Sequence, residues 1–248
     1  MQYFKRSKNI MPCYGQSSMA TVNSRSYLLV TGGSGGIGSA ICRHLVTIGV
    51  MPIVGYNSNI QQAQNLAKET GGFALKINMN NINSIKVAVQ TIEDKIEDGA
   101  ELVGVVLGAS PPPDLLPFSS LTSEHLLNQF QVNVIGSHLL ISILIKKFFR
   151  GTKSGTIIGI LSQAISIENK LPATGMGAYV IAKEALKSML SVCSAEHPWL
   201  KIRTVSPGFT KTEMLKVFDP RYLEIMQTQN VFATPEEVAE QIINEIVS

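Results

Sequence analysis

The stretch "TGGSGGIG", Thr31–Gly38, decides the reading of this chain. It follows the short apolar run "YLLV" and leads into "SAICRHLVTIG", whose apolar residues recur at helical spacing. Glycines at a strand-to-helix turn let Gly32 form a tight turn, Gly36 admit a ligand close to the backbone, and Gly38 pack the helix on the strand. Such a turn aims a helix N-terminus at an anion, as a nucleotide pyrophosphate requires. From the motif alone, a flexible loop or a hairpin remains the alternative.

The rest of the chain alternates apolar strands with amphipathic helices. Apolar strands of this kind, separated by helices, predict a parallel sheet covered on both faces. We therefore expect one doubly wound α/β domain (Rossmann-type) over residues 25–248. Its sheet should have six strands and bind ligands at their carboxyl ends. The predicted strands are 26–31, 51–56, 73–79, 102–109, 155–162 and 201–206, and the predicted helices include 82–98, 122–150, 177–196 and 234–247.

Composition excludes several classes of function. The net charge is +3, and residues 1–24 hold three of the basic residues and no acid, so the near-neutral body argues against nucleic-acid binding. We read residues 1–24 as a flexible basic extension, with a transit segment as the alternative. The three cysteines, Cys13, Cys42 and Cys193, show no paired spacing, which favours a reducing, cytoplasmic setting without a metal site. The apolar run 139–145 is too short to span a bilayer.

Four polar residues downstream are candidates for catalysis. "YVIAK" places Tyr179 and Lys183 on one face of a helix, where an ammonium group can lower the pKa of a phenol. Ser162 ends the predicted fifth strand, and Asn133 lies in "QVNVIG" on the long helix. Alone, each residue also fits a plain role: an exposed helix pair, a turn cap or a helical amide.

Together these motifs resemble the short-chain dehydrogenase/reductase family. The glycine pattern T-G-x-x-x-G-x-G, the Asn, the Ser, the Y-x-x-x-K pair and "SPGFTKT" occur in the family's order over residues 26–247, and the chain looks most like the 3-oxoacyl-carrier-protein-reductase-like group. The resemblance implies that Tyr179 is the general acid in reduction and that Lys183 binds the nicotinamide ribose and lowers the pKa of Tyr179. It also implies that Ser162 holds the substrate oxygen and that Asn133 supports a water in a proton relay.

The resemblance also implies a set of cofactor-binding residues. They are Gly32, Ser34, Gly35, Gly36, Ile37, Gly38, Tyr56, Asn57, Ser58, Asn78, Met79, Gly108, Ala109, Tyr179, Lys183, Pro207, Gly208, Thr210 and Thr212. No acid precedes Glu69, so nothing after the second strand repels a 2′-phosphate. Because no Lys or Arg lies at 57–67 either, we expect only neutral donors there and a modest preference for NADP(H), with NAD(H) possible.

Three features depart from the family pattern. "LGAS" at 107–110 lacks the amide that steadies the sheet edge in relatives, which puts local rigidity in doubt. The segment between Ser162 and Tyr179 is longer than usual, and we expect it to shape specificity. The usual seventh strand is missing, which makes a homotetramer doubtful, while a homodimer through the helices at 122–150 and 177–196 remains expected.

The predicted activity is NAD(P)(H)-dependent reduction of a ketone, of a 3-oxoacyl type or similar, to a secondary alcohol. A sugar, polyol or polyketide-intermediate dehydrogenase is an alternative, and a non-catalytic cofactor-binding partner subunit is another. The segment after Thr212 leaves the substrate open, because its apolar residues can line a pocket or simply pack as helices. They are Met214, Leu215, Phe218, Tyr222 and Met226.

Overall fold

A computed structural model describes residues 25–96, 99–165 and 171–248 of the chain. Within them, one parallel sheet has the strand order β3-β2-β1-β4-β5-β6. The strands are β1 Ser26–Thr31, β2 Val50–Tyr56, β3 Phe73–Lys76, β4 Glu101–Leu107, β5 Thr156–Ile160 and β6 Lys201–Val205. The order reverses between β1 and β4, which makes the carboxyl ends of these two strands the expected place for a ligand. The predicted extension at 1–24 lies outside the described residues.

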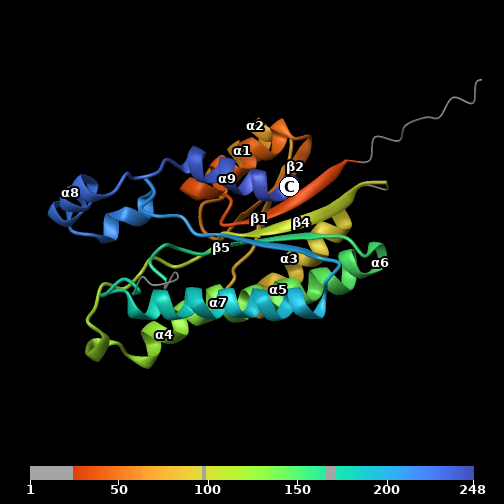
Figure 1. The fold of residues 1–248 in the computed structure, drawn as a ribbon. Coiled ribbons are helices and arrows are strands. Elements are labelled where there is room, and N and C mark those ends of the chain that lie inside the picture. Colours follow the sequence, from red (N-terminus) through yellow and green to blue (C-terminus); the bar gives the residue numbers. More distant parts are fainter. Residues whose placement is uncertain (1–24, 97–98, 166–170) are drawn as a thin grey trace, which may run out of the picture.

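Helices cover both faces of the sheet (Figure 1). One layer holds α1 Gly36–Thr47, α2 Ile60–Thr70 and α9 Pro235–Val247. The other holds α3 Ile82–Lys95, α5 Ser137–Leu144 and α7 Gly177–Glu196, with α4 Ser123–Phe130 packed against α7. The doubly wound architecture predicted from the alternating pattern is therefore confirmed.

The first strand shows how the sequence builds this core. Successive side chains of a strand point to opposite faces, so Leu28 and Val30 pack in the layer of α1 while Tyr27 and Leu29 pack in the layer of α3. All four are buried. A strand that must be apolar on both faces reads as an unbroken apolar run, which is what "YLLV" is.

The long helix predicted at 122–150 is interrupted. Between α4 and α5 lies a π-helical segment, η2 Gln131–Gly136, and a second, η3 Ile145–Phe149, leads into α6 Arg150–Thr152. By length and composition the whole run Ser123–Thr152 is apolar enough to cross a membrane, although the shorter run 139–145 is not. Its residues Leu140, Leu144 and Phe149 are fully buried in the core against the sheet, as expected of a core helix.

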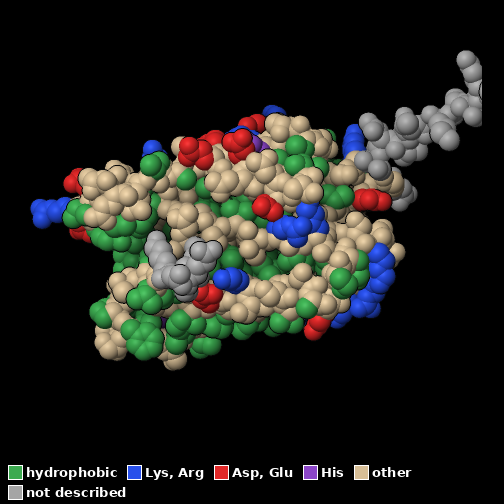
Figure 2. Space-filling model, viewed as in Figure 1, with side chains coloured by type: hydrophobic (Ala, Val, Ile, Leu, Met, Phe, Trp, Pro, Cys, Tyr) green, Lys and Arg blue, Asp and Glu red, His purple; other side chains and the backbone are tan. Residues whose placement is uncertain are grey.

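Residues 209–232, which include the segment after Thr212, form an arm at the carboxyl ends of the strands. It contains η4 Glu213–Val217 and α8 Pro220–Gln229, which project from the rest of the molecule (Figure 1). Phe209 stacks on Phe232 with 4.9 Å between ring centroids, and Phe218 stacks on Tyr222 at 5.8 Å. These aromatic residues therefore pack against one another, and the arm is held by its own aromatic cluster. Figure 2 shows hydrophobic side chains gathered at this end of the molecule.

Candidate active site

The glycine turn is shaped by close backbone contacts. Gly32 has a φ of 68°, and a Cβ at this residue would lie 3.1 Å from the Cα of Ala109. A Cβ at Gly38 would lie 2.2 Å from the carbonyl oxygen of Gly32. Helix α1 begins at Gly36, and its N-cap residue Gly35 offers no side-chain cap, so the first N–H groups of α1 are left as donors. This geometry fits an anion close to the backbone, as the sequence predicted.

A cavity of about 720 Å³ opens beside this turn. It separates the glycine turn and the start of α2 from the arm, and it is lined by Ser34, Gly35, Gly36, Asn59, Gln62, Lys211, Thr212, Glu213, Leu215, Gln227 and Phe232. Across the turn, a Cβ at Gly36 would lie 2.6 Å from Cγ2 of Thr212. A cradle of N–H donors under a cavity with one lysine suits the diphosphate of a dinucleotide.

The segment 107–110, where the amide expected by the family pattern is missing, is fixed by Thr31. The buried hydroxyl of Thr31 donates to the carbonyl of Val106 at 3.2 Å. The same oxygen accepts from the backbone N–H of Gly108 at 3.0 Å and of Ala109 at 3.2 Å. The doubt raised about local rigidity is thus answered, because a threonine on β1 holds the backbone after β4.

Ser162, Tyr179 and Lys183 come together at the end of β5. Ser162 follows this strand by two residues instead of ending it, since β5 stops at Ile160. The hydroxyls of Ser162 and Tyr179 are hydrogen-bonded. Lys183 is 2% exposed, its Nζ donates to the carbonyl of Ile160 at 2.9 Å, and it lies 5.6 Å from the ring centroid of Tyr179. The spacing of Tyr179 and Lys183 on α7 therefore produces the predicted constellation.

Burial dominates the titration of this pair. It lowers the pKa of Lys183 from 10.5 to about 7. Burial also raises the pKa of Tyr179 above its ordinary value, while the hydrogen bond from Ser162 acts in the lowering direction. The sequence expectation of a lowered Tyr179 pKa is therefore wrong for the protein alone, because the desolvation of a phenolate outweighs its stabilisation.

Asn133 lies in the π-helical segment η2, which packs against α7. Its side chain is 1% exposed, and its Nδ2 donates to the backbone carbonyl of Gln129 at 3.0 Å and to Oε1 of Gln129 at 3.1 Å. Its Oδ1 is buried without a hydrogen-bond partner among the described residues. Single-turn π-helical insertions often occur at functional sites. Asn133 thus carries a buried acceptor in the segment that packs against α7, and the family resemblance implies that this residue supports a water.

At the end of β2 the structure adds a cation that the sequence reading missed. In the parallel pairing of β2 and β3, Tyr56 lies opposite Lys76. Nζ of Lys76 donates to the backbone carbonyl of Asn57 and lies 5.7 Å from the ring centroid of Tyr56. Lys76 is far from Tyr56 in the sequence, and only the register of the two adjacent parallel strands brings them together. The segment after β2, where the sequence predicts only neutral donors, therefore has a lysine beside it.

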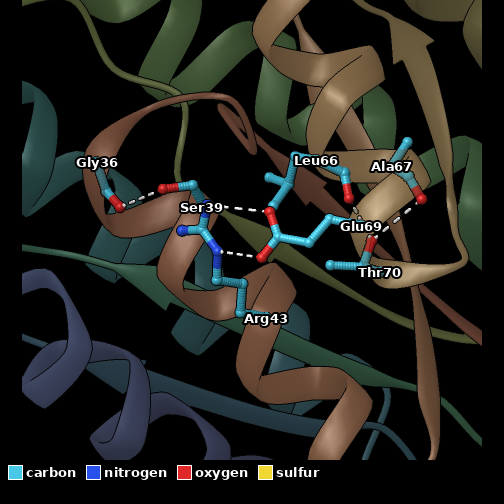
Figure 3. Close-up of polar contacts among 7 residues, drawn as sticks. All are labelled: Gly36, Ser39, Arg43, Leu66, Ala67, Glu69 and Thr70. Carbon is cyan, nitrogen blue, oxygen red and sulfur yellow. Dashed lines mark hydrogen bonds and ion pairs between the residues drawn. The ribbon is translucent and has the colours of Figure 1, made fainter.

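Other polar groups near this end are already engaged. Asn59 caps α2, accepting from the N–H of Gln62 at 3.2 Å and donating to its Oε1 at 2.7 Å. Arg43 of α1 pairs with Glu69 of α2 at 2.7 Å, as Figure 3 shows. Asn57 and Ser58 are exposed in the turn between β2 and α2. Among the described residues Lys76 forms no ion pair with a carboxylate, whereas Arg43 is paired with Glu69.

The remaining predicted cofactor residues lie at the carboxyl ends of β3 and β6. After β3, Oδ1 of Asn78 accepts from the N–H of Asn80 at 2.9 Å, and Met79 is buried. After β6, the carbonyl of Pro207 accepts from the N–H of Gln163 at 2.8 Å. A Cβ at Gly208 would lie 2.8 Å from Oε1 of Gln163. The hydrogen bond between Gln163 and Pro207 therefore ties the turn after β6 to the residue after Ser162.

The arm begins with two threonines whose side chains bond locally. The hydroxyl of Thr210 donates to the carbonyl of Gly208 at 3.1 Å, and that of Thr212 donates to the carbonyl of Thr210 at 3.3 Å. Thr210 is buried, whereas Thr212 faces the glycine turn. No group of three or more potential metal-ligating side chains occurs among the residues that the structure describes.

Fold and site together define a dinucleotide-dependent oxidoreductase of the doubly wound class. The family model for the short chain dehydrogenase matches residues 26–222, and the chain belongs to this family. It is 29% identical over 194 residues to the uncharacterized oxidoreductase YgfF of Escherichia coli (strain K12), covering 75% of this chain and 76% of that one.

Two further relatives carry descriptive names. The chain is 27% identical to the 3-oxoacyl-(acyl-carrier-protein) reductase FabG of Aggregatibacter actinomycetemcomitans, with 87% of this chain and 89% of the relative covered. It is 25% identical to an NADPH-dependent aldehyde reductase-like protein of Arabidopsis thaliana, with 80% and 77% covered. The solved 3-ketoacyl-(acyl-carrier-protein) reductase from Brucella melitensis, complexed with NADH, has the same fold with a TM-score of 0.78, 17% identity, and 89% and 90% coverage.

Proposed function

We propose that this oxidoreductase reduces the ketone of a 3-oxoacyl compound or a similar carbonyl to a secondary alcohol, with a preference for NADPH. The observation that carries this proposal is the cluster at the end of β5, where half-buried Ser162 is hydrogen-bonded to buried Tyr179 and buried Lys183 lies beside the ring of Tyr179. The names of relatives that reduce 3-oxoacyl and aldehyde substrates support the carbonyl class. A non-catalytic role is disfavoured because all three side chains are present and in contact.

In this proposal each side chain has one task. When bound, the nicotinamide cofactor supplies the hydride. The hydroxyl of Ser162 donates to the carbonyl oxygen, and Tyr179 delivers a proton to the same oxygen. The raised pKa of Tyr179 keeps its proton in place until the oxygen becomes basic. Lys183 binds the nicotinamide ribose, and a charged ribose-bound ammonium group stabilises the phenolate that remains.

The test is a panel of carbonyl compounds, with 3-oxoacyl thioesters, aldehydes and sugar ketones, measured with NADPH and NADH. We expect turnover of at least one ketone, and we expect Tyr179→Phe to lower it by at least about a hundredfold, as the loss of a general acid does. Cofactor binding, measured by fluorescence, should stay within about twofold, since the phenol contributes little to cofactor affinity. Binding of the cofactor without turnover of any compound would refute the enzymatic proposal.

We also propose the setting in which the enzyme works. Relatives of this family are typically oligomeric, and the face formed by α5 and α7 carries a groove of about 600 Å³ lined in part by His138, Ser142 and Val192. A homodimer through this face would cover Val192, which is 57% exposed. Cys42 is buried and Cys193 is half-buried, and both are free, which supports the cytoplasm as the compartment.

A further inference from the structure

Gln129 connects the loop after β4 to Asn133. Its side chain on α4 is fully buried. Its Nε2 donates to the backbone carbonyl of Pro112 at 2.8 Å, and its Oε1 accepts from Nδ2 of Asn133 at 3.1 Å. The backbone carbonyl of Gln129 accepts from the same Nδ2 at 3.0 Å. The buried amide of Gln129, bonded through both its nitrogen and its oxygen, is a stiff element, because each lost bond would leave a desolvated polar atom.

These bonds fix which end of each amide points where. A backbone carbonyl cannot donate, so Pro112 requires the nitrogen of Gln129 and turns its oxygen to Asn133. Asn133 then meets two acceptors from Gln129 and must present its nitrogen to them. If the amide of Asn133 were turned over, its Oδ1 would face the backbone carbonyl oxygen and Oε1 of Gln129, and none of the three could donate a proton. Oδ1 of Asn133 is left as the acceptor that no described group satisfies.

We propose that Gln129 is a positioning residue, which holds the amide of Asn133 so that Oδ1 accepts a hydrogen bond from a water of the proton relay. The proposal rests on the proposed function, in which Tyr179 delivers a proton, and on the part in a proton relay that the family resemblance implies for Asn133. It assigns Gln129 no contact with substrate or cofactor. A buried amide oxygen is ordinarily satisfied by protein or by ordered water, and η2 lies against the helix that carries Tyr179 and Lys183.

A purely structural role makes a different prediction. If Gln129 only anchors the loop 111–113 to α4, its loss should weaken substrate binding or stability through that loop. If it acts through Asn133, its loss should lower the rate of the chemical step and leave substrate binding nearly unchanged. The two roles therefore separate in the comparison of kcat with KM.

The first experiment is Gln129→Met, an unbranched replacement of similar length that removes both hydrogen bonds of the side chain. We expect kcat for ketone reduction to fall about tenfold with KM within about twofold. Asn128→Met is the matched control, because Asn128 is the neighbouring residue on α4 and is exposed. A change in KM with unchanged kcat would overturn the proposal, as would an equal effect of the control.

The second experiment introduces Gln129→Met into Asn133→Ala. If Gln129 acts through Asn133, the double variant should be no more than about twofold slower than Asn133→Ala alone, because coupled residues are not additive. Two effects that multiply would show that Gln129 acts elsewhere.

A crystal structure of the wild-type protein gives a reading that does not depend on turnover or on the folding of a variant. We expect an ordered water within hydrogen-bond distance of Oδ1 of Asn133. An Oδ1 that meets a protein donor, or a site without water, would overturn the proposal. Absence of turnover on every carbonyl would instead refute the proposed function, and it would leave the orientation of the Asn133 amide and the water at its Oδ1 untouched.

Discussion

Lys183 shows at the scale of one residue how a functional group opposes stability. It is buried, and its one hydrogen-bond acceptor is a backbone carbonyl, with no carboxylate partner among its described contacts. Burying an ammonium group without a counter-charge is unfavourable, and the pKa lowered to about 7 expresses that cost. Lys183 therefore lowers the folding stability of the protein, which fits the role in chemistry that we propose for it.

This cost predicts a pH-dependent difference between the wild type and Lys183→Met. The unfolded lysine titrates near 10.5 and the folded one near 7, so between these values the unfolded chain holds the extra proton. Folding stability from this group hence rises with pH across that window, and the penalty is complete below it. We expect the Tm of Lys183→Met minus that of the wild type to be larger at pH 6.5 than at pH 9.5.

Thermal unfolding of the two proteins without cofactor, in matched buffers, measures this difference. Lys187→Met on the exposed side of the same helix serves as the control and should show a constant difference. A difference that is the same at both pH values would mean that Lys183 stays charged in the folded protein across this range.

Lys76 leads to a prediction about cofactor choice. Its ammonium lies beside Tyr56 and Asn57, where a 2′-phosphate is expected, so it offers a charge-assisted bond that neutral donors cannot. We expect Lys76→Gln to lower kcat/KM with NADPH about tenfold, or by about 1.4 kcal/mol, and to leave kcat/KM with NADH nearly unchanged. Lys86→Gln, an exposed lysine on α3, is the control. An equal loss with both cofactors would place Lys76 outside the phosphate site.

At the scale of elements, the strand-turn-helix unit of β1 and α1 depends on one missing side chain. A Cβ at Gly38 would lie 2.2 Å from the carbonyl oxygen of Gly32, which belongs to the backbone and cannot rotate away. We expect Gly38→Ala to lower the free energy of unfolding by about 3 kcal/mol, as overpacking does. Gly151→Ala is the control, since nothing lies within 4 Å of its Cβ position. Denaturant unfolding of both variants decides the matter, and equal stabilities would show that the turn can relax.

The elements that the sequence predicted are those set by local pattern. Helix α7 spans Gly177–Glu196, as predicted, and α9 spans Pro235–Val247, close to the predicted 234–247, with a capping box between Thr234 and Glu237. The π-helical segment around Asn133 was not foreseen, because it depends on buried contacts between turns and not on apolar periodicity. Helix α8 was left undefined, since its packing is among aromatic residues of the arm itself.

The site divides in the same way. Ser162, Tyr179 and Lys183 were found because a short motif fixes their spacing on one element and at one strand end. Lys76 and Gln129 were missed because each acts across elements: one through the register of β2 and β3, the other through a loop carbonyl. Such pairings follow from the packed fold, and no local spacing in the sequence encodes them.

For the whole molecule, the predicted assembly is a homodimer through α5 and α7. Two helices with apolar side chains left in contact with water bury them favourably against a second copy. Val192, on α7, is 57% exposed and lines the groove there. We expect the wild type to have twice the mass of the 26.9 kDa chain, and we expect Val192→Glu to be monomeric. Light scattering measures both, with Val87→Glu on the exposed side of α3 as control; a dimeric Val192→Glu would place the interface elsewhere.

The three hydrogen bonds of the Thr31 hydroxyl bear on how this chain can diverge. One side chain on β1 holds Val106, Gly108 and Ala109 by their backbones alone. Backbone groups are the same whatever the residue, so a changed side chain at Ala109 or Ser110 leaves these bonds in place, whereas a Cβ at Gly108 would lie 2.9 Å from the carbonyl oxygen of Thr31. The hydroxyl at position 31, in contrast, is required for all three bonds. Valine would match the shape of Thr31 but could make none of its hydrogen bonds.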